Sequence, residues 1–137
     1  MNKYENGKIY KISNGELTYY GSTIQPLWQR RGTHKKYKNC KSSLIENGVL
    51  TLVEDFPCSS KEELLWKERW YIENNICVNT KKPILTDEER IQYKKDKAYR
   101  NNKKKYFCET CKVELTRNYK NKHENSVKHL KLLENNL

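Results

Sequence analysis

The strongest constraint on the fold is the spacing of two cysteines and two histidines near the C-terminal end of the chain. They occur as Cys108-x2-Cys111-x11-His123-x5-His129. Two thiolates and two imidazoles at these spacings suit tetrahedral Zn²⁺. A segment this short cannot build a core of its own, so a bound ion would supply most of its folding free energy, about 10–16 kcal/mol. The alternative is a chance clustering in a disordered tail.

The segment that contains these residues, YFCETCKVELTRNYKNKHENSVKHL, resembles a C2H2 zinc finger with a five-residue gap between its histidines. The resemblance implies a ββα-like finger over residues 106–137, of a kind found in several families that bind RNA or DNA. These residues carry six Lys and Arg against four acidic residues, which is a modest excess. We therefore expect the finger to dock on a nucleic acid rather than to read its bases.

The chain between residues 81 and 105 is strongly basic, with ten Lys and Arg against four acidic residues. Thr86 and Glu89 have the spacing of a capping box, which predicts a helix that begins there. Few apolar residues accompany it, so we expect a solvated helix or a semi-flexible linker that contacts phosphates. The lysines assigned to this contact are Lys94, Lys95, Lys103 and Lys104.

The formal net charge of the whole chain, +11, indicates a polyanionic partner, most often nucleic acid. The alternative is a solvated basic surface with no partner. Hydrophobic residues make up only 35% of the chain. No apolar run approaches the roughly 18 residues that span a bilayer, and no signal peptide opens the chain. We therefore expect a soluble intracellular protein without a membrane partner.

The first structural element is predicted in GKIYKISNGELTYYGST, residues 7–23. Asn-Gly between two alternating runs favours a β-hairpin with a two-residue type I′ turn at positions 14 and 15. That turn pairs Tyr10 with Tyr19 and Ile12 with Leu17. A side-chain period of two then places all four on one face of the hairpin.

The rest of the first 80 residues alternates helices and a strand. A helix is expected from Leu27, weakened by Gly32, and a third strand over residues 49–56. A capping box of Ser60 and Glu63 predicts a helix over residues 61–74, and a short extended piece follows at 76–79. The predicted fold is of the mixed α/β class (α+β), with a small three-stranded antiparallel sheet flanked by helices.

Glu68 lies in the middle of the apolar stripe of the helix predicted over residues 61–74. It is three or four positions from Leu64, Leu65, Tyr71 and Ile72, which share one helix face. A buried carboxylate without a partner is unfavourable by several kcal/mol. Glu68 is therefore expected to have a partner, either a metal ion or an arginine, and the alternative is an ordinary ion pair at the rim of the core.

Four short motifs occur in a fixed order along residues 6–80. They are KIY at 8–10, YYG at 19–21, WQRRGTH at 28–34 and ERWYIENN at 68–75, followed by an asparagine in CVN. Together they resemble the GIY-YIG endonuclease family. Two positions depart from the family pattern, because Lys8 replaces a glycine of the first motif and Tyr20 an isoleucine of the second. With this resemblance the chain divides into a nuclease domain at 1–80, a basic linker at 81–105 and the finger at 106–137.

The resemblance implies a role for each matched residue. Glu68 would hold one divalent ion, Mg²⁺ or Mn²⁺, and Arg30 the scissile phosphate. Tyr10 would act as general base for the attacking water, with its pKa lowered by positive charge nearby, or would position that water. Tyr19 would hydrogen-bond near the same phosphate. His34 is a second proton-transfer or phosphate-binding group, and the asparagine that closes the family's core corresponds to Asn79.

Each of these residues also has a structural interpretation. Tyr19 could pack in the core, and Arg30 and His34 could lie on a solvated basic face. Asn79 could serve only to pin the chain after the preceding helix. Six Lys and Arg fall between residues 30 and 41 without an acid among them. Those assigned to nucleic-acid binding are Arg31, Lys35 and Lys36.

These patterns together predict a metal-dependent endonuclease that hydrolyses phosphodiester bonds in duplex or branched DNA, with a zinc finger that aids binding. RNA is a second substrate class. The alternative is a nucleic-acid-binding protein that uses a nuclease-like scaffold without catalysis. The sequence leaves open the oligomeric state and the setting, which could be a virus with AT-rich coding, a mobile element or a repair pathway.

Overall fold

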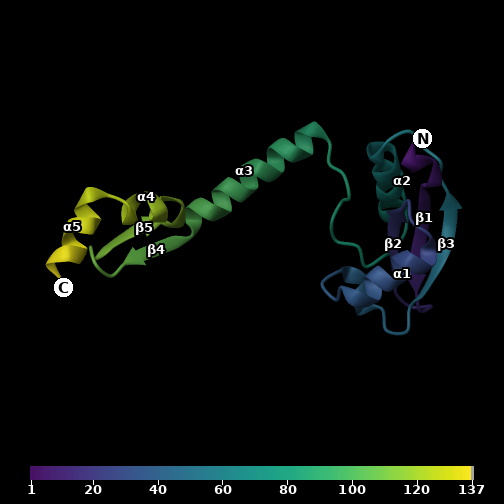
Figure 1. Ribbon diagram of the computed structural model, residues 1–137, viewed down its shortest axis with the longest axis horizontal. Helices are drawn as coiled ribbons and strands as arrows, with labels where there is room; N and C mark the ends of the chain where they lie inside the picture. Colours follow the sequence, from purple (N-terminus) through teal and green to yellow (C-terminus); the bar gives the residue numbers. More distant parts are fainter. Residues whose placement is uncertain (137) are drawn as a thin grey trace. The chain divides into compact units, whose positions relative to one another are not determined.

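The computed structural model describes residues 1–136. They form two compact units, which divide between Leu85 and Thr86 (Figure 1). Both units mix helices with antiparallel strands, which confirms the predicted α+β class. Among the described residues, no helix combines the length and the apolar character needed to cross a membrane.

The first unit is built on a three-stranded antiparallel sheet in the order β2-β1-β3. Its strands are β1 (Lys8–Ser13), β2 (Thr18–Thr23) and β3 (Val49–Asp55). Two α-helices, α1 (Leu27–Lys36) and α2 (Lys61–Asn74), and two 3₁₀ helices, η1 (Lys3–Asn6) and η2 (Lys41–Leu44), accompany it. This order makes β1 the central strand and leaves β2 at an edge of the sheet.

The register of the β1–β2 hairpin differs from the predicted one by two residues. Tyr10 lies opposite Gly21 and Ile12 opposite Tyr19, and four residues form the loop instead of two. The side chain of Asn14 accepts hydrogen bonds from the backbone N–H groups of Glu16 and Leu17, at 3.1 and 2.9 Å. This Asx turn replaces the predicted type I′ turn. A shift of two residues preserves the alternation of side chains, so Tyr10 and Tyr19 still share a face.

Gly21 allows the phenol group of Tyr10 to approach the backbone of β2 closely. A Cβ atom at this position would collide with the phenol oxygen and ring carbons of Tyr10. Tyr10 is fully buried and packs with Ile12 and Ile45 in the core between the sheet and α1. The glycine of YYG is therefore required by a close approach of a side chain that the predicted hairpin register placed elsewhere.

Helix α2 begins where the sequence predicts, but only half of its capping box forms. Ser60 Oγ accepts a hydrogen bond from the backbone N–H of Glu63 at 3.3 Å. The carboxylate of Glu63 instead accepts from the backbone N–H of Ser59 at 3.1 Å, and from the hydroxyl of the same residue. The N-terminal turn of α2 is thus capped from two consecutive serines.

The predicted extended piece at 76–79 is not a strand, yet it covers the open edge of β2. The backbone N–H of Val78 donates to the carbonyl of Thr18 at 2.8 Å. An edge strand with unpaired backbone groups is a site for unwanted pairing. The segment 76–79 therefore protects the edge of β2, although it does not form the continuous hydrogen bonds of a strand.

The second unit begins with helix α3 (Asp87–Lys103), on which Thr86 and Glu89 form both halves of the predicted capping box. A two-stranded sheet of β4 (Lys105–Cys108) and β5 (Val113–Thr116) follows. The chain then forms η3 (Arg117–Tyr119), α4 (Lys120–Glu124) and α5 (Val127–Asn135). The helical part of this unit is thus interrupted between His123 and His129, where Ser126 caps α5.

Candidate active site and metal centre

The hydroxyl of Tyr10 is held between two residues of α1. Arg30 Nε donates a hydrogen bond to it at 2.9 Å, and His34 Nε2 lies 2.6 Å from it. Arg30 and His34 are four residues apart and therefore project from one face of the helix. The structure thus joins three of the residues singled out in the sequence through one oxygen atom.

The direction of the proton on Tyr10 follows from its partners. The Nε–H group of arginine can only donate, so the Tyr10 oxygen accepts from Arg30. The phenol hydrogen is then left for His34 Nε2. The other ring nitrogen of His34, Nδ1, lies 2.8 Å from Ser42 Oγ in η2 and serves as its donor. We infer a chain of hydrogen bonds from Arg30 through Tyr10 and His34 to Ser42.

Burial shifts the pKa values of Tyr10 and His34 in opposite directions. Burial raises the pKa of the Tyr10 hydroxyl far above its usual value, and Arg30 offsets only part of this rise. The charge of Arg30 lowers this pKa as expected, but burial outweighs it, so the prediction of a pKa below the usual value is wrong. Burial, together with the charge of Arg30, lowers the pKa of His34 to about 4. At neutral pH the tyrosine is protonated and the histidine is neutral.

The neutral state of His34 makes the stability of the first unit depend on pH. The unfolded chain binds a proton at this residue below about pH 6.5, whereas the folded chain does so only near pH 4. The free energy of unfolding should therefore fall as the pH drops through this window, and less so in His34→Gln. Denaturant titrations at pH 7.0, 5.5 and 4.5 would measure this by tryptophan fluorescence, because all three tryptophans lie in the first unit. Parallel curves for the two proteins would contradict the assignment.

Tyr19 both packs in this site and faces an open cavity. Its ring meets the ring of His34 edge-on, with centroids 5.5 Å apart. It also lines a cavity of about 380 Å³ together with Cys40, Glu68 and Asn79. Burial raises the pKa of its hydroxyl, and the charge of Glu68 adds to this rise. Tyr19 thus lies between the hydrogen bonds around His34 and the carboxylate of Glu68.

Glu68 approaches β2 from the opposite face of the sheet. Its Oε2 accepts a short hydrogen bond from the hydroxyl of Ser22, which alternates with Tyr19 and Gly21 along the strand. Burial raises the pKa of Glu68, and the Ser22 hydroxyl and the charge of Arg30 offset part of this rise. The sequence predicted a metal ion or an arginine as its partner, and the structure shows a serine that sequence reasoning missed.

The oxygen donors around Glu68 suit a hard divalent cation. A carboxylate next to a hydroxyl, open to a cavity that admits water, is the type of set that Mg²⁺ or Mn²⁺ prefers. Burial makes the charged carboxylate unfavourable, and a cation bound there would relieve this cost. Glu68 therefore fits the predicted metal role.

The most buried charge on α2 is Arg69, which sequence reasoning did not single out. Its Nε donates to Glu73 at 2.7 Å and its Nη1 to the backbone carbonyl of Ile84 at 3.0 Å. Only 8% of Arg69 is exposed. The carbonyl contact ties the last residues of the first unit to the helix, so Arg69 has a structural function. Helical spacing alone could not reveal this role, because the contact depends on where the chain passes after the end of α2.

Asn79 uses both ends of its amide group on the backbone of Tyr20. Its Oδ1 accepts from the Tyr20 N–H at 2.9 Å, and its Nδ2 donates to the Tyr20 carbonyl at 2.8 Å. The side chain thereby imitates a neighbouring strand along β2. Asn79 lines the same cavity as Glu68, but these contacts support the structural interpretation, in which it pins the chain.

The basic residues assigned to nucleic-acid binding are all exposed and fall into two separate groups. Those of the first unit lie on α1, and those of the second lie on or directly after α3. Lys36 turns toward the ring of Tyr37, and Lys103 toward the ring of Tyr99. The α1 group is Arg31, Lys35 and Lys36, and the α3 group is Lys94, Lys95, Lys103 and Lys104.

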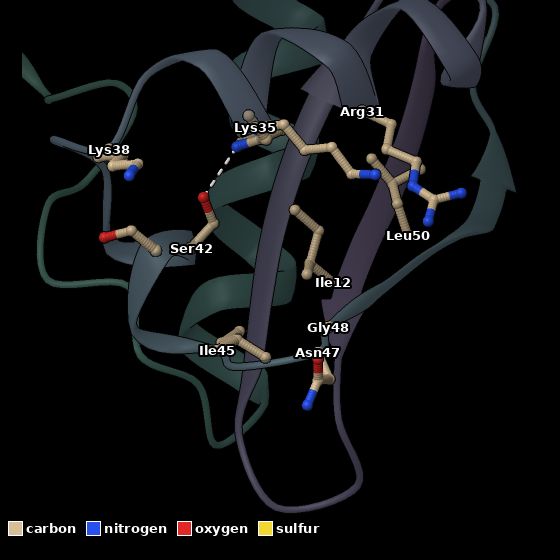
Figure 2. Close-up of a pocket in the computed structure, with 11 residues that line it drawn as sticks. Ile12, Arg31, Lys35, Lys38, Ser42, Ile45, Asn47, Gly48 and Leu50 are labelled. Carbon is tan, nitrogen blue, oxygen red and sulfur yellow. Dashed lines mark hydrogen bonds between the residues drawn. The ribbon is translucent and has the colours of Figure 1, made fainter.

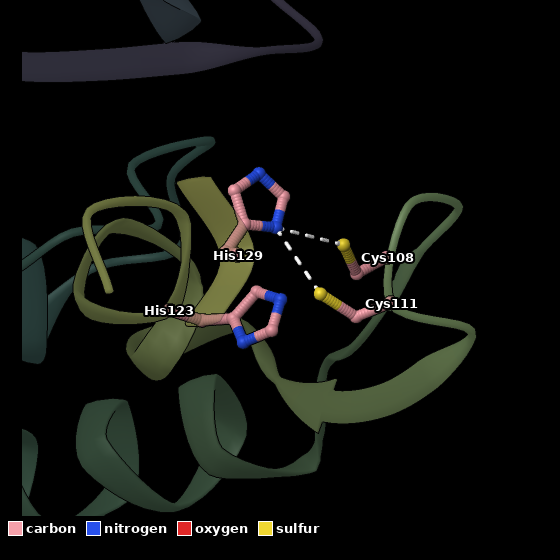
Figure 3. A group of neighbouring side chains, drawn as sticks. All are labelled: Cys108, Cys111, His123 and His129. Carbon is pink, nitrogen blue, oxygen red and sulfur yellow. Dashed lines mark hydrogen bonds between the residues drawn. The ribbon is translucent and has the colours of Figure 1, made fainter. Parts of the chain in front are cut away.

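The second unit contains a cluster of metal-binding side chains, all four of which were predicted (Figure 3). One ligand atom from each residue lies within 4.8 Å of the others. Both thiol sulfurs are 3.4 Å from His129 Nδ1. Zn–S and Zn–N bonds of about 2.3 and 2.0 Å at a tetrahedral angle place sulfur and nitrogen about 3.5 Å apart. The distances therefore fit a single tetrahedral ion. Its ligands would be Cys108, Cys111, His123 and His129.

A buried nitrogen without a partner supports this metal centre. Nε2 of His123 is buried and has no hydrogen-bond partner among the described residues. Buried polar atoms are almost always satisfied, and an absent ion is a common reason for an exception. The cluster is thus suited to bind a metal ion, and its cysteines are free thiols.

The chain was compared with protein-family models, curated proteins and solved structures. No family model, no curated protein and no solved structure matches the chain.

Proposed function

We propose that the first unit is a metal-dependent endonuclease that hydrolyses phosphodiester bonds in DNA. The observation that carries this proposal is the placement of the Tyr10 hydroxyl between the guanidinium of Arg30 and the neutral imidazole of His34. The carboxylate of Glu68 and the hydroxyl of Tyr19 share the adjoining cavity. The resemblance of the ordered motifs to the GIY-YIG endonucleases supports the same chemistry.

The hydrogen-bonded chain can move one proton away from an attacking water. Once bound substrate opens the buried Tyr10 hydroxyl to water, the water gives a proton to the Tyr10 oxygen while the phenol proton passes to His34 Nε2, so no free phenolate forms. The water oxygen then bonds to phosphorus, the bond to the leaving sugar oxygen breaks, and that oxygen takes a proton from solvent. Because the pKa of His34 is about 4, the imidazolium returns its proton to solvent after each turnover.

The remaining groups neutralise charge on the phosphate. Arg30 donates to Tyr10 through Nε, which leaves its terminal nitrogens for the phosphoryl oxygens. A divalent ion held by Glu68, such as Mg²⁺ or Mn²⁺, would supply Lewis acidity at the same phosphate. Tyr19 can donate a hydrogen bond toward it from the cavity wall. Asn79 acts only by holding β2 in place.

In the second unit we propose a structural Zn²⁺ ion at the Cys2His2 cluster. The ion would hold together a finger in which several large side chains remain exposed, including Phe107 and Tyr119. The basic residues of α3 would contact DNA phosphates and the finger would dock beside them. This combination raises affinity without base-specific contacts.

Cleavage of supercoiled plasmid by the zinc-loaded protein tests the proposed function. Nicking should require added Mg²⁺ or Mn²⁺ and should fall about 10²–10⁴-fold in His34→Gln, which keeps a hydrogen-bond acceptor but cannot take a proton. Gln29→Ala, at an exposed position of the same helix, is the matched control and should nick normally. Salt-dependent DNA binding without nicking in either metal would instead establish the alternative, a non-catalytic binding protein.

A further inference from the structure

Two cavities lie beside each other along α1, next to the site described above. The larger, of about 600 Å³, lies between α1, η2 and the start of β3, and the smaller has about 500 Å³. They share Arg31, Lys35 and Leu50 as lining residues, so they form one continuous surface. We call this surface the α1 groove.

The α1 groove carries one exposed aromatic ring and a row of cations. Trp28, Arg31 and Lys35 follow one another at intervals of three and four residues, which places them along one side of the helix. Lys38, just beyond the end of α1, also lines the larger cavity. Trp28 is 77% exposed, an unusual state for the largest side chain. Neither cavity has an acidic residue among its lining residues.

The base of the groove is apolar. Ile12, Ile45 and Leu50 line it, and Figure 2 shows Arg31 and Lys35 extending from α1 toward Leu50 with Ile12 below them. A surface with cations along its rim, an apolar base and a free indole ring matches a ligand with negative charges and flat apolar faces. Nucleotides of a single strand combine these properties, whereas paired bases hide their faces in the stack.

The groove reaches the proposed active site through His34. This residue contacts the Tyr10 hydroxyl with one ring nitrogen, while its ring also lines the larger cavity. The two neighbouring arginines serve one site each: Arg30 contacts Tyr10, and Arg31 lines the groove. A strand held in the groove would therefore continue directly to the scissile phosphate.

We propose that the α1 groove binds an unpaired stretch of DNA, with a base stacked on Trp28 and phosphates on Arg31, Lys35 and Lys38. This inference rests on the proposed function and specifies its substrate class. The preferred substrate is DNA with unpaired nucleotides next to the cleaved bond, such as a flap or a branch, and not continuous duplex.

Binding of fluorescently labelled oligothymidylate and of a blunt duplex to the full zinc-loaded chain, without Mg²⁺ or Mn²⁺, tests this proposal. Trp28→Ala should weaken binding of the single strand about tenfold and binding of the duplex less than twofold. Trp70→Ala removes another exposed tryptophan of the same unit, on α2, and should change neither affinity. Lys35→Gln should reduce the salt dependence of single-strand binding by about 0.7 in the log–log slope.

Gly32→Leu blocks the groove instead of removing a contact. A side chain at this helical position meets open space, so the substitution should raise the melting temperature while it weakens single-strand binding. Equal losses for single strand and duplex in Trp28→Ala, or equal effects of Trp28→Ala and Trp70→Ala, would overturn the proposal. Displacement of oligothymidylate by an acidic peptide at similar concentration would also overturn it.

The binding assay separates this inference from the proposed function. If the single strand binds through the groove but no nicking occurs in Mg²⁺, the proposed groove is supported and the proposed nuclease activity is contradicted. Nicking of plasmid with single-strand binding unaffected by Trp28→Ala and Gly32→Leu would remove the groove assignment and leave the nuclease.

Discussion

Cys108→Ser is expected to abolish zinc binding and to unfold the finger while the first unit stays intact. Cys108 is 1% exposed, and its sulfur lies 3.4 Å from His129 Nδ1 at the centre of the cluster. Zinc binding in such peptides contributes about 10–16 kcal/mol, far more than the few buried contacts of this unit can replace. Metal analysis of the purified wild type should find about one zinc per chain, and the variant close to none.

Two optical signals should separate the units in this experiment. All three tryptophans lie in the first unit, so tryptophan fluorescence and its denaturation curve should be unchanged in Cys108→Ser. Circular dichroism should show a loss of helix from α4 and α5. Cys77→Ser, a free thiol far from the cluster in the sequence, is the matched control and should keep its zinc. Full zinc occupancy in Cys108→Ser would exclude the proposed site.

Glu68→Gln is expected to reduce metal-dependent cleavage by roughly 10³-fold, the scale of a group that neutralises charge at the reacting phosphate. Glutamine has the same shape and can still accept a hydrogen bond from Ser22, but it lacks the charge that holds the cation. Plasmid nicking in Mg²⁺ measures the loss. Glu62→Gln, on the exposed first turn of the same helix, should retain full activity.

The stability of Glu68→Gln distinguishes a lost metal ligand from a damaged fold. Burial raises the pKa of Glu68, so the charged carboxylate is unfavourable in the folded protein at pH 7. The neutral variant should therefore be at least as stable as the wild type without divalent ions. Mg²⁺ should raise the melting temperature of the wild type and not of the variant. Equal nicking by both proteins would refute the role of Glu68.

The local elements were predictable because they depend on residues close together in the sequence. Helix α2 starts at its serine cap, and α3 starts at the capping box of Thr86 and Glu89. The exact partners were less predictable, because backbone N–H groups near Asn14 and Ser59 can donate to alternative side-chain acceptors. The register of the hairpin therefore differs from the predicted one by two residues, and each side chain still lies on its predicted face.

The proposed site depends on contacts that no local pattern encodes. Ser42 reaches His34 from η2, and Ser22 reaches Glu68 from β2. A serine in a short loop or on an edge strand has no periodicity that marks it as a partner. Burial also reversed one expectation, since the desolvation of Tyr10 outweighs the nearby charge of Arg30.

The sequence by itself determined the element types, the alternation that places Tyr10 and Tyr19 on one face, and the four metal-binding residues of the finger. Each depends on the spacing of residues along the chain, because the geometry of a helix or strand fixes on which face each side chain lies. Only the tertiary structure decided that the Tyr10 proton faces His34, because burial and partner choice arise when distant segments pack together. For the same reason the α1 groove appears only once α1 lies against Ile12 and Leu50.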